Sequence, residues 1–183
     1  MGKEGILKLQ NIDLNLITYG KKAGVEENVK LKIIIPLLQL LGYDINKNMD
    51  FEHSVRNKRA DIGLKINDVL KMIVECKSIE QDLDKHIEQA LDYAWKKQVN
   101  WVILTNGIET RLYKTWIENV PEAKDRELWR VNLRELEKQF KKLAEWVSHK
   151  SLSTYKIQEI SQEEERKIVE NVTEPQLVQN LKN

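Results

Sequence analysis

The run Ala60-Asp61-Ile62-Gly63-Leu64-Lys65-Ile66, with Leu70-Lys71-Met72-Ile73-Val74-Glu75-Cys76-Lys77 after it, decides the fold predicted for this chain. Polar and apolar side chains alternate along residues 60–66, which is typical of a half-buried strand. Residues 70–77 form a second, more apolar run, and Asn67-Asp68 between the two is typical of a turn. The sequence therefore predicts an antiparallel β-hairpin here.

Three charged residues of this hairpin indicate a metal site. Because side chains alternate along a strand, Asp61 can share a face with Glu75 and Lys77. A three-residue loop over 67–69 would place Asp61 directly opposite Glu75, at about 4.5–5.5 Å between Cβ atoms, close enough to share one divalent ion. A two-residue loop would place Asp61 opposite Val74 instead. The prediction of a shared metal site depends on the three-residue loop.

The chemistry of this trio suits hydrolysis of a phosphodiester with Mg²⁺. Mg²⁺ prefers a few carboxylate oxygens together with water and substrate phosphate, and it lowers the pKa of a bound water. Lys77 could position or help deprotonate that water. A lone Glu-x-Lys is more often a solvated ion pair on a strand face. Here it ends an apolar strand, Asp61 precedes it by one hairpin, and Gln89 and Tyr93 follow one helical turn apart.

Other periodic segments complete an α/β pattern. Apolar residues at every fourth position predict a helix from Val25 to Leu41 that Gly42 ends and Pro36 kinks. Residues 1–24 are expected to be a polar lead with a short apolar element. Residues 43–58 are expected to be an irregular stretch or a weak strand around 49–55. The remaining predicted elements are helices at 80–98 and 132–148 and strands at 101–105 and 109–113. This order predicts a mixed β-sheet flanked by helices.

Length and composition indicate one soluble domain with a tail. The 183 residues are 41% hydrophobic and 32% charged, which suits one globular domain, expected over residues 1–150. Beyond Ser151 the chain becomes polar, and we expect residues 151–183 to form a helical appendage of two short helices. This tail could pack on the domain, join a partner chain or stay mobile.

Charge, cysteine content and hydropathy exclude several classes of protein. A net charge of +1 argues against a constitutive nucleic-acid binder, although local patches or a metal ion could still bind phosphate. A single cysteine excludes an internal disulfide or a zinc site made of cysteines, and Cys76 is expected in the core. No apolar run is long enough to span a bilayer and no signal region opens the chain, so we expect a cytoplasmic protein without a membrane partner.

Some further residues have open alternatives. The basic stretch around His53, with Arg56, Lys58 and Arg59, could contact a DNA backbone or be a plain solvated loop. The five tryptophans mostly fit core positions, and base stacking by Trp116 or Trp129 is conceivable.

The ordered motifs resemble the PD-(D/E)xK nuclease superfamily, and more closely the N-terminal nuclease domain of type I restriction-enzyme R subunits. Asp61, Glu75-Cys76-Lys77 and the helix from Gln89 to Tyr93 carry the superfamily likeness. The closer likeness covers about residues 25–115. Its motifs are an acidic residue opening a helix (Glu26) that ends in Leu41-Gly42-Tyr43, then Ala60-Asp61-Ile62, Ile73 to Lys77, Gln89 to Tyr93, Leu104 to Gly107, and Leu112-Tyr113.

This resemblance implies a restriction-endonuclease-like fold and endonucleolytic cleavage of DNA with Mg²⁺, for which Mn²⁺ can substitute. Asp61 and Glu75 would be metal ligands and Lys77 the catalytic lysine. Glu26 would complete the metal site, although Glu27 is equally possible from spacing alone. Gln89 and Tyr93 would contact DNA or the active site.

The sequence departs from the family in two respects. No proline precedes Asp61, and the 183 residues contain no phosphate-binding Gly-Lys-Thr loop or motor domain. A nuclease domain without a motor must act differently or rely on a partner. The rival hypothesis is a non-catalytic binding subunit of a restriction, defence or viral assembly. Double-strand cleavage would need two sites, which makes a homodimer plausible, and RNA instead of DNA remains an alternative substrate.

Overall fold

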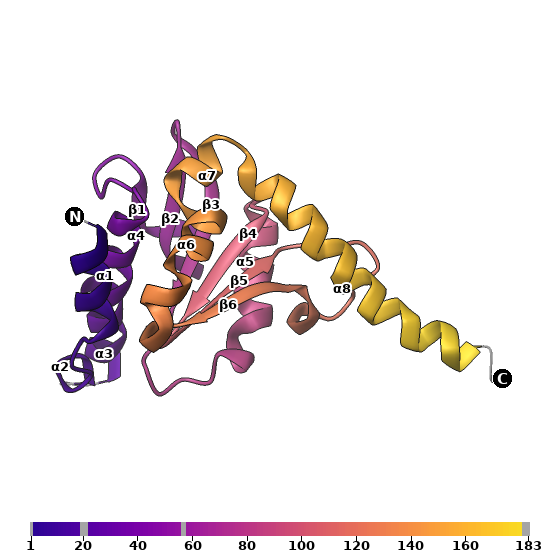
Figure 1. Ribbon diagram of the computed structural model, residues 1–183, viewed down its shortest axis with the longest axis horizontal. Helices are drawn as coiled ribbons and strands as arrows, with labels where there is room; N and C mark the ends of the chain where they lie inside the picture. The colour runs from indigo at the N-terminus through magenta and orange to yellow at the C-terminus, as the bar shows by residue number, and fades with distance from the viewer. Residues whose placement is uncertain (1, 19–21, 56–57, 181–183) are drawn as a thin grey trace.

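A six-stranded mixed β-sheet lies at the centre of the computed structural model of the protein (Figure 1). The structure describes residues 2–18, 22–55 and 58–180. Neighbouring strands are antiparallel except β3 and β4, which are parallel. The strands, in both chain and spatial order, are β1 (Met49–Val55), β2 (Lys58–Ile66), β3 (Val69–Cys76), β4 (Trp101–Thr105), β5 (Glu109–Lys114) and β6 (Glu127–Asn132).

One face of the sheet is covered by the crossover that joins the parallel strands β3 and β4. This connection consists of the 3₁₀ helix η2 (Leu83–His86) and the helix α5 (Ile87–Lys96). Parallel neighbours need such a crossover, because a tight turn cannot join them. The apolar face of α5 packs on the sheet; the buried residues of this core are Ile73, Leu83, Ile87, Ala90, Leu91, Tyr93, Ala94, Val99, Val102, Leu104 and Tyr113.

The other face carries the larger core and most of the helices. Strand alternation directs Ile62, Leu64, Met72, Val74 and Cys76 to this side, and all five are buried there. Cys76 is thus the core residue that the sequence predicts. The helices are α1 (Gly2–Gln10), α2 (Asn15–Thr18), α3 (Lys22–Val29), η1 (Lys30–Ile34), α4 (Ile35–Leu40), α6 (Leu136–Val147), α7 (His149–Ser153) and α8 (Lys156–Asn180). Helices therefore flank a mixed sheet on both faces, which confirms the predicted fold class.

The β2–β3 hairpin turns through two residues, so the three-residue loop expected from the sequence is wrong. Asn67 and Asp68 have φ angles of 49° and 63°, and Ile66 pairs directly with Val69. Positive φ at both central residues is the requirement of a type I′ turn, and Asn and Asp tolerate it better than most residues. In an unbroken ladder this turn would put the two carboxylates on different faces.

A β-bulge after the second pair from the turn, Lys65 with Leu70, shifts the register so that the two carboxylates can share a face. Lys71 is an extra residue of β3, because the register shifts between Lys65 and Leu64, and Leu64 pairs with Met72. Extending the shifted register by one residue from the pair Ile62–Val74 places Asp61 opposite Glu75. Bulges re-aim side chains in this way next to functional sites.

The predicted helix from Val25 to Leu41 forms, but it changes type in the middle. The π-helical turn η1 separates α3 from α4, and Ile35 N–H donates to the Lys30 carbonyl. Pro36 follows at the start of α4, where its missing N–H removes the fewest helical hydrogen bonds. The kink expected at Pro36 thus corresponds to a π-turn just before it. Gly42, with φ 93°, ends the helix as predicted.

Three elements differ from the sequence-based expectation. Residues expected as a polar lead form α1, which buries Ile6 and Leu9, and residues 127–132 form the edge strand β6. The tail forms α7 and one long helix α8 instead of two short helices. Two 3₁₀ turns complete the fold, η3 (Ala123–Arg126) and η4 (Leu133–Glu135).

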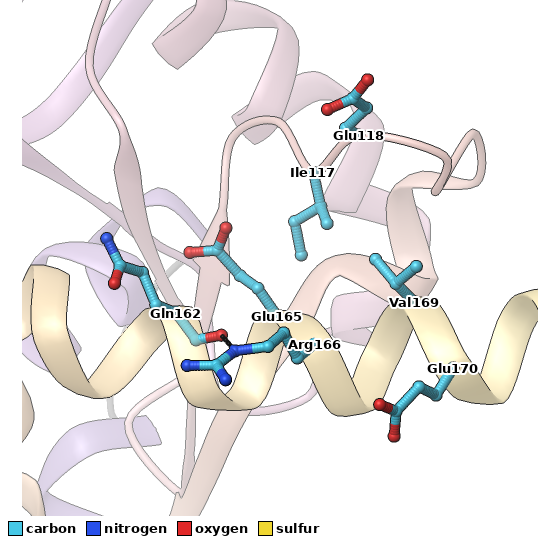
Figure 2. A pocket seen from close by; sticks show the side chains of 7 residues that line it. All are labelled: Ile117, Glu118, Gln162, Glu165, Arg166, Val169 and Glu170. Carbon is cyan, nitrogen blue, oxygen red and sulfur yellow. Dashed lines mark hydrogen bonds between the residues drawn. The ribbon is translucent and has the colours of Figure 1, made fainter.

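Helix α8 packs on the domain over its first half. Ile157 is fully buried in the larger core, and Lys114 Nζ of β5 lies 2.7 Å from Glu165 Oε1. Farther along, Val169 faces Ile117 across a shallow pocket (Figure 2). Of the three expectations for the tail, the structure thus supports packing on the domain, while a domain boundary at residue 150 stays a prediction. In the described part of the chain, no helix is long and apolar enough to cross a membrane.

Candidate active site

Two carboxylates from neighbouring strands form the centre of the candidate site. Asp61 of β2 and Glu75 of β3 are only 20% and 11% exposed as side chains. Asp61 Oδ2 accepts a hydrogen bond of 2.7 Å from the backbone N–H of Cys76, which ties this side chain across to β3. The structure thus joins Asp61 to the strand that carries Glu75, as the sequence predicts.

Lys77 follows at the end of β3 and contacts the same cluster. Its Nζ lies 2.6 Å from Glu75 Oε1, and its side chain is 13% exposed. Its backbone N–H donates to the carbonyl of Thr105 at 2.7 Å, so the ladder between β3 and β4 extends to this residue. The backbone hydrogen bond therefore fixes the position of the Lys77 main chain, and the ion pair with Glu75 fixes the position of its ammonium group.

The helix that passes this end of the hairpin contributes a second lysine. Lys30 in the π-turn η1 is 11% exposed; its Nζ lies 2.7 Å from Glu27 Oε2 and 3.8 Å from Asp61 Oδ1. Sequence reasoning missed Lys30. The signal was available, because Lys30 follows Glu26 by four residues and so lies on the same helix face.

Glu26 and Glu27, the two alternatives left by the sequence, occupy different surroundings. Glu27 is about half exposed and pairs with Lys30. Glu26 is partly buried, and burial raises its pKa, while the positive charge of Lys77 lowers it and the negative charge of Asp61 raises it further. Charges of the hairpin thus act on both acids: Lys77 and Asp61 interact with Glu26, and Asp61 interacts with Glu27, so the choice between the two stays a prediction.

Burial dominates the electrostatics of the two central carboxyls. It raises the pKa of Asp61, although the hydrogen bond from Cys76 and the charge of Lys30 lower it. Burial likewise raises the pKa of Glu75 against the opposing effect of Lys77. A buried carboxylate beside other carboxylates is costly, and a cation bound there would relieve the cost.

Lys77 is held in its charged form. Burial alone would lower its pKa, but the adjacent Glu75 carboxylate outweighs this effect and the pKa of Lys77 is raised. A protonated lysine donates hydrogen bonds and offsets negative charge, whereas it cannot accept a proton. A charged Lys77 can position a water or a phosphate, and its role in catalysis stays a prediction.

The turn from Thr105 to Gly107 holds the two halves of the site together. Asn106 Oδ1 accepts hydrogen bonds from the backbone N–H groups of Ile108 and Glu109, at 3.1 and 2.9 Å, which closes the turn. Gly107 has φ 86°, and a Cβ there would lie 2.9 Å from Val29 Cγ1. Only glycine lets this turn approach the helix that carries Glu26 and Lys30 so closely.

The remaining predicted site residues lie on α5, on the strands β1 and β2, or outside the described residues. On α5, Gln89 is exposed, whereas the Tyr93 ring is buried in the smaller core, so the two do not present one common surface. His53 lies in strand β1 and not in a loop, and Lys58 and Arg59 begin β2. Arg56 lies outside the described residues.

The donor set can be compared with the needs of Mg²⁺. Within the described ranges, no three His, Cys, Asp or Glu side chains gather closely enough to form a metal cluster. The three-carboxylate site expected from Glu26, Asp61 and Glu75 is therefore not assembled as a tight triad. Two buried carboxylates on adjacent strands still fit Mg²⁺, which is commonly held by one or two carboxylates with water and substrate phosphate.

Comparison with known proteins found similar solved structures and one matching family. A structure described as a fragment of an HsdR subunit of a type I restriction enzyme from Vibrio vulnificus YJ016 is 24% identical, with a TM-score of 0.44, over 70% of this chain. The chain in a DrdV–DNA complex is 18% identical, with a TM-score of 0.50, over 80% of this chain. The protein spans only 27% and 14% of those two chains. Among curated proteins none matches.

The model of one protein family matches residues 25–122, which is more than half of the chain. The matched segment includes the helix with Glu26 and Lys30, the whole β2–β3 hairpin, α5 and the turn at Gly107. All the residues that build the candidate site thus lie inside it. The chain belongs to the family described as the type I restriction enzyme R protein N terminus (HSDR_N).

Proposed function

We propose that this protein is a Mg²⁺-dependent endonuclease domain that hydrolyses DNA phosphodiester bonds. The observation that carries the proposal is the buried cluster of Asp61, Glu75, Lys77 and Lys30, in which carboxylates and ammonium groups meet at the end of an apolar hairpin. A purely structural ion pair would rarely be buried at this density, because desolvation of each charge opposes folding. The family membership supports the same function.

Each residue of the cluster has a distinct role in this proposal. Asp61 and Glu75 hold Mg²⁺ or Mn²⁺, and Glu26 adds a carboxylate from the helix side. When bound, the metal supplies an activated water and offsets charge on the phosphate. Lys77, held protonated by Glu75, orients that water and donates to the phosphate oxygens.

Residues around the cluster would position the substrate. Gln89, exposed on α5, contacts the DNA backbone in this proposal. Tyr93 is buried beneath it, and we propose that it supports the helix instead of stacking on DNA. Because one site cuts one strand, double-strand cleavage would use a homodimer or a larger restriction or defence complex, in the cytoplasm.

Cleavage by the purified chain tests the proposal. Supercoiled, linear and single-stranded DNA, and RNA of the same sequence, are incubated with Mg²⁺, with Mn²⁺ and with EDTA. We expect metal-dependent cleavage of DNA that Asp61→Ala abolishes. Intact DNA in every condition, or equal cleavage by Asp61→Ala, would contradict the function, and faster cleavage of RNA would change the substrate.

One observation favours a second candidate, a non-catalytic subunit of a larger assembly. No tight triad of potential metal ligands exists in the part of the chain that the structure describes, and Glu75 is engaged by Lys77 at 2.6 Å. Calorimetric titration with Mn²⁺ distinguishes the two. Saturable binding that Glu75→Gln weakens supports the nuclease, whereas no measurable binding supports the assembly subunit.

A further inference from the structure

Two exposed tryptophans lie at the end of the sheet opposite the charged cluster. Trp95 and Trp116 are 60% and 52% exposed, and their ring centroids are 5.6 Å apart at an interplanar angle of 49°. Trp95 is in the last turn of α5, and Trp116 follows β5. The other tryptophans, Trp101, Trp129 and Trp146, are buried. Exposed aromatic rings gathered in one place are characteristic of binding surfaces.

The position of this pair separates it from the candidate active site. Glu75 pairs with Leu104 near the end of β4, whereas Thr115, beside Trp116, donates to the carbonyl of Asn100, just before β4 begins. Four residues of extended strand separate these levels, or about 13 Å at 3.3 Å per residue. A ligand on the tryptophans would therefore not occupy the charged cluster.

Arg126 fixes the Trp116 ring in its exposed position. Its guanidinium lies 4.9 Å from the centroid of the Trp116 ring and donates to the carbonyls of Val120, Thr115 and Pro121 at 2.9, 3.1 and 2.5 Å. The hydrogen bonds of this one side chain thus hold together the segment that connects β5 and β6. A surface that is already ordered loses less entropy on binding than a mobile one.

A pocket with carboxylates lies on one side of the tryptophan pair. It has a volume of about 400 Å³ between α5 and the connection that follows β5. Leu91 and Pro121 contribute apolar lining, and Glu88, Asp92 and Glu122 contribute carboxylates. Asp92 pairs with Lys96 at 2.6 Å. Arg126 also lines the pocket and interacts electrostatically with Glu122, whereas Glu88 has no ion-pair partner among the described residues, so the three carboxylates outnumber the one cation of the lining.

A second pocket lies on the other side of the same two rings. Its volume is about 420 Å³, and it shares Trp95, Thr115 and Trp116 with the first. The rest of its lining is uncharged: Gln98, Val99 and Asn100. The two pockets thus form a groove that crosses the tryptophan pair, acidic at one end and neutral at the other.

We infer that this groove binds an arginine-bearing segment of another protein. A guanidinium group both pairs with carboxylates and stacks on indole rings, and Arg126 already makes that stacking contact with Trp116. Adjacent acidic and neutral pockets suit an extended peptide, with the arginine near Glu88 and Glu122 and an uncharged neighbour near Asn100. The same carboxylates would repel a nucleic-acid phosphate. The inference does not depend on nuclease activity.

NMR of the five indole N–H groups tests the inference on the full chain. The probe is the peptide acetyl-Ala-Arg-Ala-amide, compared with the same peptide carrying citrulline, which is nearly isosteric but uncharged. Trp95→Phe and Trp116→Phe assign the two signals. We expect both signals to shift saturably with the arginine peptide in the millimolar range, and at least about fivefold weaker binding of the citrulline peptide.

Charge variants supply the matched control. The double change Glu88→Gln and Glu122→Gln should weaken arginine-peptide binding at least about threefold, whereas Glu159→Gln, an exposed carboxylate on α8, should leave it unchanged. Equal binding of the arginine and citrulline peptides would overturn the inference, as would the absence of any shift. Shifts of both indoles on adding a short DNA duplex, or on raising the protein concentration alone, would assign the surface to DNA or to self-association instead.

Discussion

The two ends of the sheet depart from the usual distribution of side chains in opposite directions. At one end Asp61, Glu75, Lys77 and Lys30 are charged and mostly buried; at the other Trp95 and Trp116 are apolar and mostly exposed. Charged residues are rarely buried in proteins unless they are paired, and large apolar residues are rarely gathered on a surface without a reason. Each end therefore presents groups that a folded chain alone does not need there.

The two departures differ in what they cost the fold. Burying the charges opposes folding, because each ion loses hydration that its ion pairs replace only in part. Exposing the rings costs little stability but leaves apolar area in contact with water. We therefore expect substitutions at the charged end to change activity strongly, and we expect the neutralisation of Asp61 to increase stability. Substitutions at the aromatic end should change binding of a partner and little else.

The largest expected effect is the loss of cleavage in Lys77→Met. Methionine keeps the length of the side chain but removes the ammonium that contacts Glu75, so the carboxylate loses its partner and the phosphate loses a donor. We expect the cleavage rate to fall at least about 100-fold, or about 2.7 kcal/mol in activation free energy. Lys65→Met is the matched control, because Lys65 forms an equally short ion pair, 2.7 Å to Asp50, on the same hairpin. Equal losses in both variants would make Lys77 merely structural.

A smaller effect is expected at Lys30, which contacts Asp61 from the helix side. Lys30→Met removes a positive charge 3.8 Å from Asp61 Oδ1, so we expect the KM for DNA to rise about tenfold, equal to about 1.4 kcal/mol, through lost attraction for phosphate. Affinity for Mn²⁺ should be retained or increase, because an ammonium group beside the carboxylate opposes a second cation. The control is Lys32→Met on the same helix, whose ammonium donates to the Leu16 carbonyl in an exposed position. Weaker Mn²⁺ binding in Lys30→Met would refute this role.

The third prediction is a gain in stability, whereas the first two are losses of activity. Folding raises the pKa of Asp61, so at pH values above its folded-state pKa the charged carboxylate destabilises the protein, while at pH values below its unfolded-state pKa this cost is absent. Asp61→Asn keeps an oxygen that can accept from Cys76 N–H and removes the charge. We expect the free energy of unfolding to increase by about 1 kcal/mol at pH 7, a rise of about 2–4 °C in Tm. The gain should shrink towards pH 4. A loss of stability at pH 7 would show that the ion pair with Lys30 stabilises the fold.

These predictions rest on a site whose residues the sequence indicated for a partly mistaken reason. Asp61, Glu75 and Lys77 come together, but through a two-residue turn and a bulge at Lys71 instead of a three-residue loop. Two carboxylates that act together must lie on the same face of the hairpin. A three-residue loop and a two-residue turn with a bulge both place them there. Periodicity could not distinguish them, because a bulge leaves no pattern of its own in a short strand.

The elements that the sequence missed share a different cause. Helix α1 and strand β6 are short, with three large apolar residues each, so their structure comes from contacts with the rest of the fold. Arg134, for example, donates to the carbonyl of Gln10 at 2.6 Å and so fastens α1 to residues more than a hundred positions away. The spacing of Lys30 from Glu26 indicates a shared helix face, but it does not indicate that the lysine is buried beside Asp61.

The smallest expected effect, at the aromatic end, tests whether that end is a surface or part of the core. Trp95→Ser removes an exposed ring whose main aromatic contact is Trp116, so the free energy of unfolding should fall by only about 0.5 kcal/mol, the low end for an aromatic pair. Trp129→Ala, at a buried tryptophan, should cost about 3–5 kcal/mol in the same urea titration. DNA cleavage should be unchanged in Trp95→Ser, because the ring lies at the far end of the sheet. A loss of more than about 2 kcal/mol there would mean that the ring supports the fold. Its exposure would then need no binding partner to explain it, and the contrast between the two ends would not hold.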